Sequence, residues 1–403
     1  MRRLAVPLVG AFASGMAPGL VAAALAFMAV GDAAKSLFVS ASMCGMLAAS
    51  IAGGFLADRL GRVRAMRFAG WIALLVTPFL CVPQPLFALA LAGRFAQGFG
   101  LGLFSVLLPL YIAETQPDNR RGRATAFYQF SNSFGGIVGA LCGFAVANWG
   151  QSLSPSIVWR IDILLIIPVL LAFVAGSLFV RLGTVPEKLG TVPLGDVGTV
   201  PVKRVVLAVV VLALTSATGI GSVMHYSVTM LSAAGLSGAR ANVADAAMRV
   251  CGLLAALLSA AFIDRRGRAF VLKVGTAGAV VALAAAGGLF LALKLGTVPD
   301  CLGTVPIAGL CISVLLCAFV AFFSFGPGVC VWVVAAELLP ASVRAKGMSF
   351  ALLGNQMVTA AIASVFLPVA SRFGYAPLFF AFALASAAYF AIACVISRFR
   401  NLV

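Results

Sequence analysis

Long apolar stretches constrain this chain more than any other feature of its sequence. Each is long enough, at 1.5 Å per residue, to cross a hydrocarbon core of about 30 Å. Backbone groups in lipid must be hydrogen-bonded within the segment, so we predict α-helices and an all-α membrane protein with twelve transmembrane helices. The stretches cover roughly residues 4–30, 36–57, 66–83, 86–113, 123–147, 156–180, 205–231, 241–263, 269–293, 306–336, 346–370 and 374–397.

Composition and charge agree with a membrane protein. The chain is 63% hydrophobic and 10% charged, whereas a soluble domain is about half apolar and about a quarter charged. The formal charge of +17 would suit nucleic acid, but most Lys and Arg fall in loops that are cytoplasmic if the N-terminus is inside. We therefore expect a multi-pass protein, in the plasma membrane, with both termini in the cytoplasm and no nucleic-acid partner.

Charged signatures occur once in each half of the chain. The sequence DRLGR at 58–62 returns as DRRGR at 264–268. Each half also carries a glutamate followed seven residues later by an arginine, Glu114 with Arg121 and Glu337 with Arg344. Duplicated loops of this kind predict two copies of one helical bundle, which is typical of carriers.

A loop rich in Gly, Pro and charge separates the two halves. It contains Gly-Thr-Val-Pro three times, and the same tetrapeptide occurs twice in the loop between the ninth and tenth stretches. Because these loops lie on opposite sides of the membrane, we interpret the repeat as a flexible spacer. The predicted domains are an N-terminal six-helix bundle at 1–180, a cytoplasmic linker at 181–204 and a C-terminal six-helix bundle at 205–403.

Charged and glycine-rich motifs follow one another in a fixed order along the chain. They are GFLADRLGR at 54–62, Gly93-Arg94, QGFGLG at 97–102, PLYIAE at 109–114, Pro117, Arg121-Gly122, Trp159-Arg160, Pro168, GPG at 326–328, Trp332, Glu337, Pro340, Arg344, Lys346 and Gly347. This ordered set resembles the major facilitator superfamily, and within it the sugar porter family. The resemblance implies two pseudo-symmetric bundles that move a hexose, or a similar sugar or polyol, by alternating access. No nucleophile–base set or metal cluster is evident, so we expect neither an enzyme nor a cofactor.

The same resemblance implies a sugar site between the bundles. Gln129 matches a sugar-binding glutamine, Trp332 an aromatic that stacks on the sugar, and Asn355 an asparagine of the site. Amides can both donate to and accept from sugar hydroxyls, and an aromatic ring offers an apolar platform. The alternative for Gln129 and Asn355 is a polar contact between helices.

The seventh span departs from the family pattern. Thr215 and Ser216 stand where the family has paired glutamines. In the eleventh span, Gln356 stands where the family has a tryptophan. Short hydroxyls therefore replace long amides, and we do not expect strict specificity for glucose.

Charges at the cytoplasmic helix ends are expected to form an inner gate by pairing across the bundles. Each exposed pair contributes about 0–1 kcal/mol, so several together suit a reversible switch. The alternative is that these charges serve only topology and loop solubility. The expected gate residues are Asp58, Arg62, Glu114, Arg121, Asp264, Arg268, Glu337 and Arg344.

Few carboxyls lie inside the spans. Proton-driven sugar porters carry an aspartate in the first span, and Ala17 stands at or near that place, so we expect facilitated diffusion by a uniporter. Asp162 lies near the mouth of the sixth span. Asp245 and Arg249 are four residues apart in the eighth span, where they neutralise each other or contact substrate or gate.

Three other functions stay open from the sequence. One is a proton-coupled sugar symporter, for which Asp162 or Asp245 would carry the proton. Another is a major facilitator carrier of organic ions or drugs, which the amides missing from the seventh span and Arg249 favour. The third is a non-transporting nutrient sensor, for which the few residues after Ser397 offer no output module.

Overall fold

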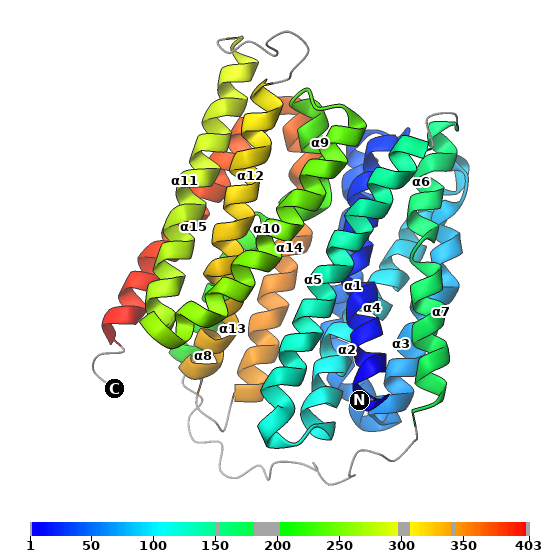
Figure 1. The fold of residues 1–403 in the computed structure, drawn as a ribbon, viewed down its shortest axis with the longest axis vertical. Coiled ribbons are helices and arrows are strands. Elements are labelled where there is room, and N and C mark those ends of the chain that lie inside the picture. The colour runs from blue at the N-terminus through cyan, green and yellow to red at the C-terminus, as the bar shows by residue number, and fades with distance from the viewer. Residues whose placement is uncertain (1, 150–152, 181–201, 297–306, 340–343, 400–403) are drawn as a thin grey trace. The chain divides into compact units, whose positions relative to one another are not determined.

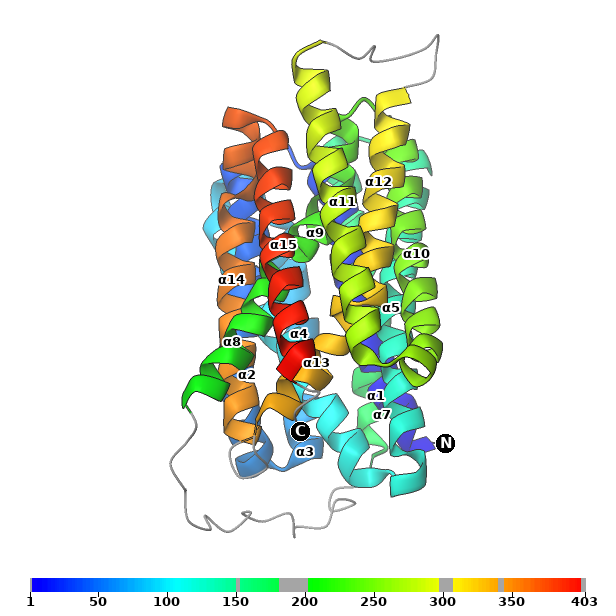
Figure 2. The ribbon, with the colours of Figure 1, turned by 90° about the vertical axis from the view of Figure 1, so that its left-hand side faces the viewer.

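The computed structural model describes residues 2–149, 153–180, 202–296, 307–339 and 344–399, and over these ranges the chain is helical (Figures 1 and 2). Twelve of its helical segments are long and apolar enough to cross a membrane. The predicted fold class and number of spans are confirmed.

The first compact unit contains residues 1–29 and 37–200. Within it α1 packs against α5, and α3 packs against α4 and α7. Its core includes the fully buried rings of Tyr111, Phe104 and Phe173. Its elements are α1 (Arg2–Phe27), α2 (Asp32–Leu60), α3 (Arg62–Val76), the 3₁₀ turns η1 (Thr77–Cys81) and η2 (Gln84–Leu86), α4 (Phe87–Thr115), α5 (Asp118–Trp149), α6 (Pro155–Leu164) and α7 (Ile167–Leu178).

The second compact unit contains residues 201–403 together with 30–36, the segment that includes the start of α2. Here α8 packs against α14, and α11 packs against α12 and α15. Figures 1 and 2 both show α10, α11 and α12 side by side. The elements are α8 (Val202–Ala217), α9 (Ile220–Ala233), α10 (Gly238–Arg266), α11 (Arg268–Lys294), α12 (Ile307–Phe325), α13 (Pro327–Leu338), α14 (Arg344–Phe373) and α15 (Ala376–Phe399).

The packing of the first unit is repeated in the second. Span 1 contacts span 5 as span 7 contacts span 11, and span 3 contacts spans 4 and 6 as span 9 contacts spans 10 and 12. The duplication read from the charged loops therefore extends to the choice of helix partners.

Within the described residues, three spans are broken into two α-helices, which the apolar pattern did not predict. Span 6 divides between α6 and α7, span 7 between α8 and α9, and span 10 between α12 and α13. Pro168 and Pro327 lie in the first turns of α7 and α13, and Gly219 adopts a left-handed conformation between α8 and α9. Hydropathy averages over a window, so it detects the span but not the interruption.

Small residues allow α1 and α5 to approach closely. A Cβ atom on Gly19 would lie 2.8 Å from both the amide nitrogen of Ala140 and the carbonyl oxygen of Gly136. Close backbone approach of this kind is the usual means of helix association in lipid. The Gly-Thr-Val-Pro repeats and the linker up to residue 201 lie outside the described residues, apart from Gly296.

Candidate functional site

The repeated charged loop has the same backbone geometry in both units. Gly61 separates α2 from α3 with φ 79° and ψ 152°, and Gly267 separates α10 from α11 with φ 80° and ψ 160°. Residues that carry a side chain rarely adopt this backbone conformation, whereas glycine adopts it readily and so permits the turn. The next residue, Arg62 or Arg268, then begins a helix in each unit.

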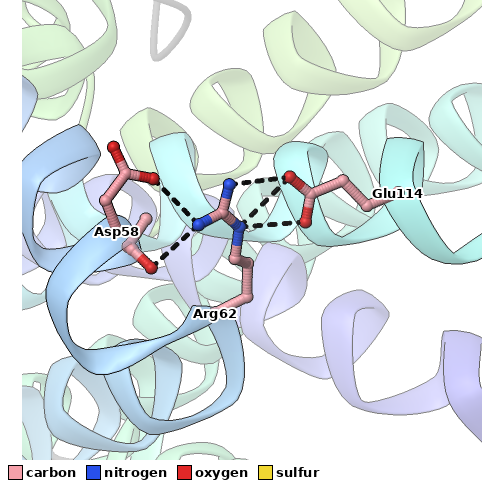
Figure 3. Close-up of polar contacts among 4 residues, drawn as sticks. Asp58, Arg62 and Glu114 are labelled. Carbon is pink, nitrogen blue, oxygen red and sulfur yellow. Dashed lines mark hydrogen bonds and ion pairs between the residues drawn. The ribbon is translucent and has the colours of Figure 1, made fainter. Parts of the chain in front are cut away.

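Arg62 lies between two carboxylates of unit 1 (Figure 3). Its Nη1 donates to Asp58 Oδ1 and to the Ala57 carbonyl oxygen, both at 2.9 Å. Its Nε lies 3.1 and 3.0 Å from the two oxygens of Glu114, and its Nη2 donates to Glu114 Oε1 at 3.0 Å. This bidentate contact joins the start of α3 to the end of α4. A bidentate pair between arginine and a carboxylate is stronger than a hydrogen bond between neutral groups.

The two carboxylates have unequal surroundings. The Glu114 side chain is 6% exposed and that of Asp58 is 76% exposed. Because water screens Asp58 and not Glu114, the Arg62–Glu114 pair dominates the stability of the turn. Both partners belong to the first compact unit, so this pair joins two helices of one bundle.

The remaining predicted gate residues are less completely described. Arg268 begins α11, and its carbonyl oxygen lies 3.9 Å from the sulfur of Cys330 on α13. The expected pairing across the bundles stays a prediction. The side chains of Arg121, Asp264, Glu337 and Arg344 lie outside the described residues.

Two predicted substrate residues, Asn355 and Ser216, lie on the contact between α8 and α14. The Asn355 amide donates to the Leu212 carbonyl oxygen at 2.8 Å. Thr359, one turn further along α14, donates to Ser216 Oγ at 2.8 Å. The Thr215 hydroxyl donates to the Val211 carbonyl oxygen at 2.9 Å within its own helix.

This face supports both interpretations of Asn355. Its amide nitrogen links two helices, as the polar-contact alternative requires, and its side chain is only partly buried, as a ligand-binding role requires. Thr359 was missed by the sequence analysis. The signal was its spacing of four residues from Asn355, which places both on one side of a helix.

The other predicted substrate residues, Gln129, Gln356 and Trp332, lie on separate helices. Gln129 is exposed on α5 of unit 1, and Gln356 is partly buried on α14 of unit 2. The side chain of Trp332 lies outside the described residues. The substrate role of all six residues stays a prediction.

Asp245 and Arg249 form a buried network with α9. Arg249 Nε donates to Asp245 Oδ2 at 2.9 Å, and an Nη atom donates to the Met224 carbonyl oxygen at 2.8 Å. Ser227 donates to Asp245 Oδ1 at 2.6 Å. The pair is therefore neutralised within unit 2 and ties α10 to α9; Ser227 was missed because nothing in its sequence context singles it out.

Comparison with solved structures identifies the fold. The chain is similar to a crystal structure of a D-xylose-proton symporter, with a TM-score of 0.83 and 18% identity, over 97% of this chain and 96% of that one. It is also similar to the xylose transporter XylE from E. coli in an inward-open conformation, with a TM-score of 0.81 and 17% identity, over 97% and 94% of the two chains. These two likenesses show that the chain has the twelve-span fold of these transporters.

Sequence comparison narrows the class to a family. A family model described as sugar (and other) transporter matches residues 15–183 and 196–397. Relatives include a probable polyol transporter 4 of Arabidopsis thaliana, 28% identical over 84% of this chain and 70% of that protein. A D-xylose-proton symporter-like 1 of the same plant is 27% identical over 90% and 77%, and a myo-inositol transporter 1 of Saccharomyces cerevisiae is 27% identical over 83% and 64%. The chain belongs to the sugar transporter family, whose matched members are transporters and not enzymes.

Proposed function

We propose that this sugar transporter moves a hexose or a related polyol by alternating access of its two bundles. The observation that carries the proposal is the family match over nearly the whole chain, combined with a polar face on α8 and α14 inside an apolar protein. Polar groups within a membrane protein are expensive, and their presence favours a hydrated ligand.

The relatives favour a broad substrate class. Their names include a polyol transporter, a myo-inositol transporter and a xylose symporter. The short hydroxyls of Thr215 and Ser216 leave more room than glutamines would, so we propose that a polyol or a range of hexoses fits this site.

The proposed site combines Gln129 with Trp332, Asn355, Thr215, Ser216 and Gln356. We predict that Trp332→Ala and Gln129→Ala each abolish uptake of labelled sugar into proteoliposomes, because one loses the stacking platform and the other an amide. The control is Trp149→Ala, at a tryptophan that is 84% exposed at the end of α5, and it should transport normally. Unchanged uptake by both site variants would show that the site is assigned wrongly.

An organic-anion carrier is less favoured by the geometry. That alternative used Arg249 as a free cation, whereas Asp245 and the Met224 carbonyl oxygen occupy its donors. A competition panel of sugars, polyols and organic anions against labelled hexose separates the two functions.

The location of the protein and its gate belong to the same proposal. We infer the plasma membrane, cytoplasmic termini and an inner gate made by the charged helix ends. The inference on topology is supported by the distribution of Lys and Arg.

The mode of transport depends on where a proton can bind. From Leu4 to Phe27, α1 has no ionisable side chain, and Ala17 is buried. Because α1 supplies no proton site, transport is facilitated diffusion unless a carboxyl on another helix binds the proton.

A further inference from the structure

Asp162 is a buried carboxyl that the proposed sugar site does not use. It lies on α6, seven residues and therefore about 10 Å along the helix from Pro155, inside a membrane span. Its exposed fraction is 0%. Neither carboxyl oxygen has a hydrogen-bond partner among the described residues.

The surroundings of Asp162 supply no counter-charge. On its own helix, Arg160 turns away, because its Nε donates to the Cys81 carbonyl oxygen at 2.8 Å and its guanidinium stacks on Trp159 at 4.8 Å. Of the elements packed on α6, α5 contributes the Cys142 thiol within electrostatic range. From η1 comes the Cys81 thiol, which points to the Arg160 carbonyl oxygen, and α1 contributes no titratable group from Leu4 onward.

Two other buried carboxyls of the described chain do have hydrogen-bond partners. Glu114 accepts bidentate hydrogen bonds from Arg62, and Asp245 accepts hydrogen bonds from Ser227 and Arg249. A carboxylate needed only for structure would be expected to have such partners, because an ionised group enclosed without them is strongly unfavourable. In the enclosed state Asp162 is therefore a carboxylic acid that holds its proton.

A break in the helix lies directly beside this carboxyl. The last residue of α6 is Leu164, and α7 begins at Ile167. Pro168 has no N–H to offer the Leu164 carbonyl oxygen, so a backbone acceptor is freed within one turn of Asp162. Broken spans with free backbone groups are where secondary transporters place their ion sites.

We propose that Asp162 is a proton-binding site that couples sugar transport to proton movement, which makes this carrier a proton–sugar symporter. The carboxylate takes one proton from water on one side, is enclosed as the neutral acid, and returns that proton to water on the other side. The coupling rests on the proposed sugar transport; proton binding does not.

The transport test compares wild type with Asp162→Asn in proteoliposomes. Wild type should accumulate labelled sugar above equilibrium when the outside is acidic, and a protonophore should abolish the accumulation. Asp162→Asn, of nearly equal size, should lose accumulation but keep sugar counterflow. The matched control Asp32→Asn removes a carboxyl at the start of α2 and should keep both activities.

The outcomes separate the coupling from the sugar function. Accumulation by Asp162→Asn, or counterflow without accumulation by wild type, would overturn the coupling and leave the sugar function standing. Absence of counterflow with every sugar and polyol would overturn the sugar function.

Proton binding has a readout that needs no sugar. The infrared difference spectrum of wild type minus Asp162→Asn at neutral pH should contain the carbonyl band of a protonated carboxylic acid, shifted in heavy water. Asp162→Glu should shift this band and serves as the second variant if Asp162→Asn does not fold. A spectrum without the band would overturn the proton site whatever the transport assay shows.

Discussion

At the scale of single residues, Arg62 in the charged turn makes one strong and one weak contact. Arg62 forks onto a nearly enclosed Glu114, whereas its bond to Asp58 faces water. Exposure decides their contributions, because solvent screening weakens only the second.

Neutralising the two carboxylates should therefore have different effects. Glu114→Gln leaves the Arg62 guanidinium without its enclosed counter-charge, and we expect the free energy of unfolding to fall by about 1–3 kcal/mol. Asp58→Asn should change it by about 0–1 kcal/mol. Unfolding of both variants in detergent measures the difference, and equal losses would contradict it.

At the scale of elements, the structure shows breaks within the spans that hydropathy did not predict. Span 7 changes direction at Gly219, where φ is 82° and an added Cβ would collide with the ring of Phe382. The break leaves Thr215 and Ser216 on the last turn of α8, where Ser216 contacts Thr359 of α14.

Replacing the glycine at this break should damage the carrier. Gly219→Ala combines a left-handed backbone with a steric clash, and we expect a loss of about 1–3 kcal/mol in stability together with reduced sugar uptake. The control is Gly288→Ala on α11, where a Cβ meets nothing within 4 Å and helix propensity favours alanine. Thermal unfolding and uptake of the two variants test the claim, and equal behaviour would refute it.

At the scale of the whole molecule, duplication and charge asymmetry set the topology. Each unit repeats the same helix partners, and the basic residues gather in the loops expected to face the cytoplasm.

This topology has a direct test in cells. A tag at the C-terminus should react with antibody only after the cells are permeabilised, whereas a tag in the loop at 297–306 should react on intact cells. The physical reason is that positively charged loops resist translocation. The opposite labelling pattern would invert the proposed orientation and with it the assignment of the inner gate.

The sequence by itself determined the all-helical class, the twelve spans and the duplicated turns, because hydropathy and glycine-containing motifs are local properties of the chain. It also selected Asp58, Arg62 and Glu114 among the eight expected gate residues, with pairing expected across the bundles. Only the tertiary structure decided the partners. It turned Thr359 toward Ser216, joined Asp245 and Arg249 to Ser227 and Met224 of α9, and left Asp162 enclosed without a hydrogen bond to the described residues. Which polar groups meet depends on how separate helices pack and where they break, and no periodicity within one segment contains that information.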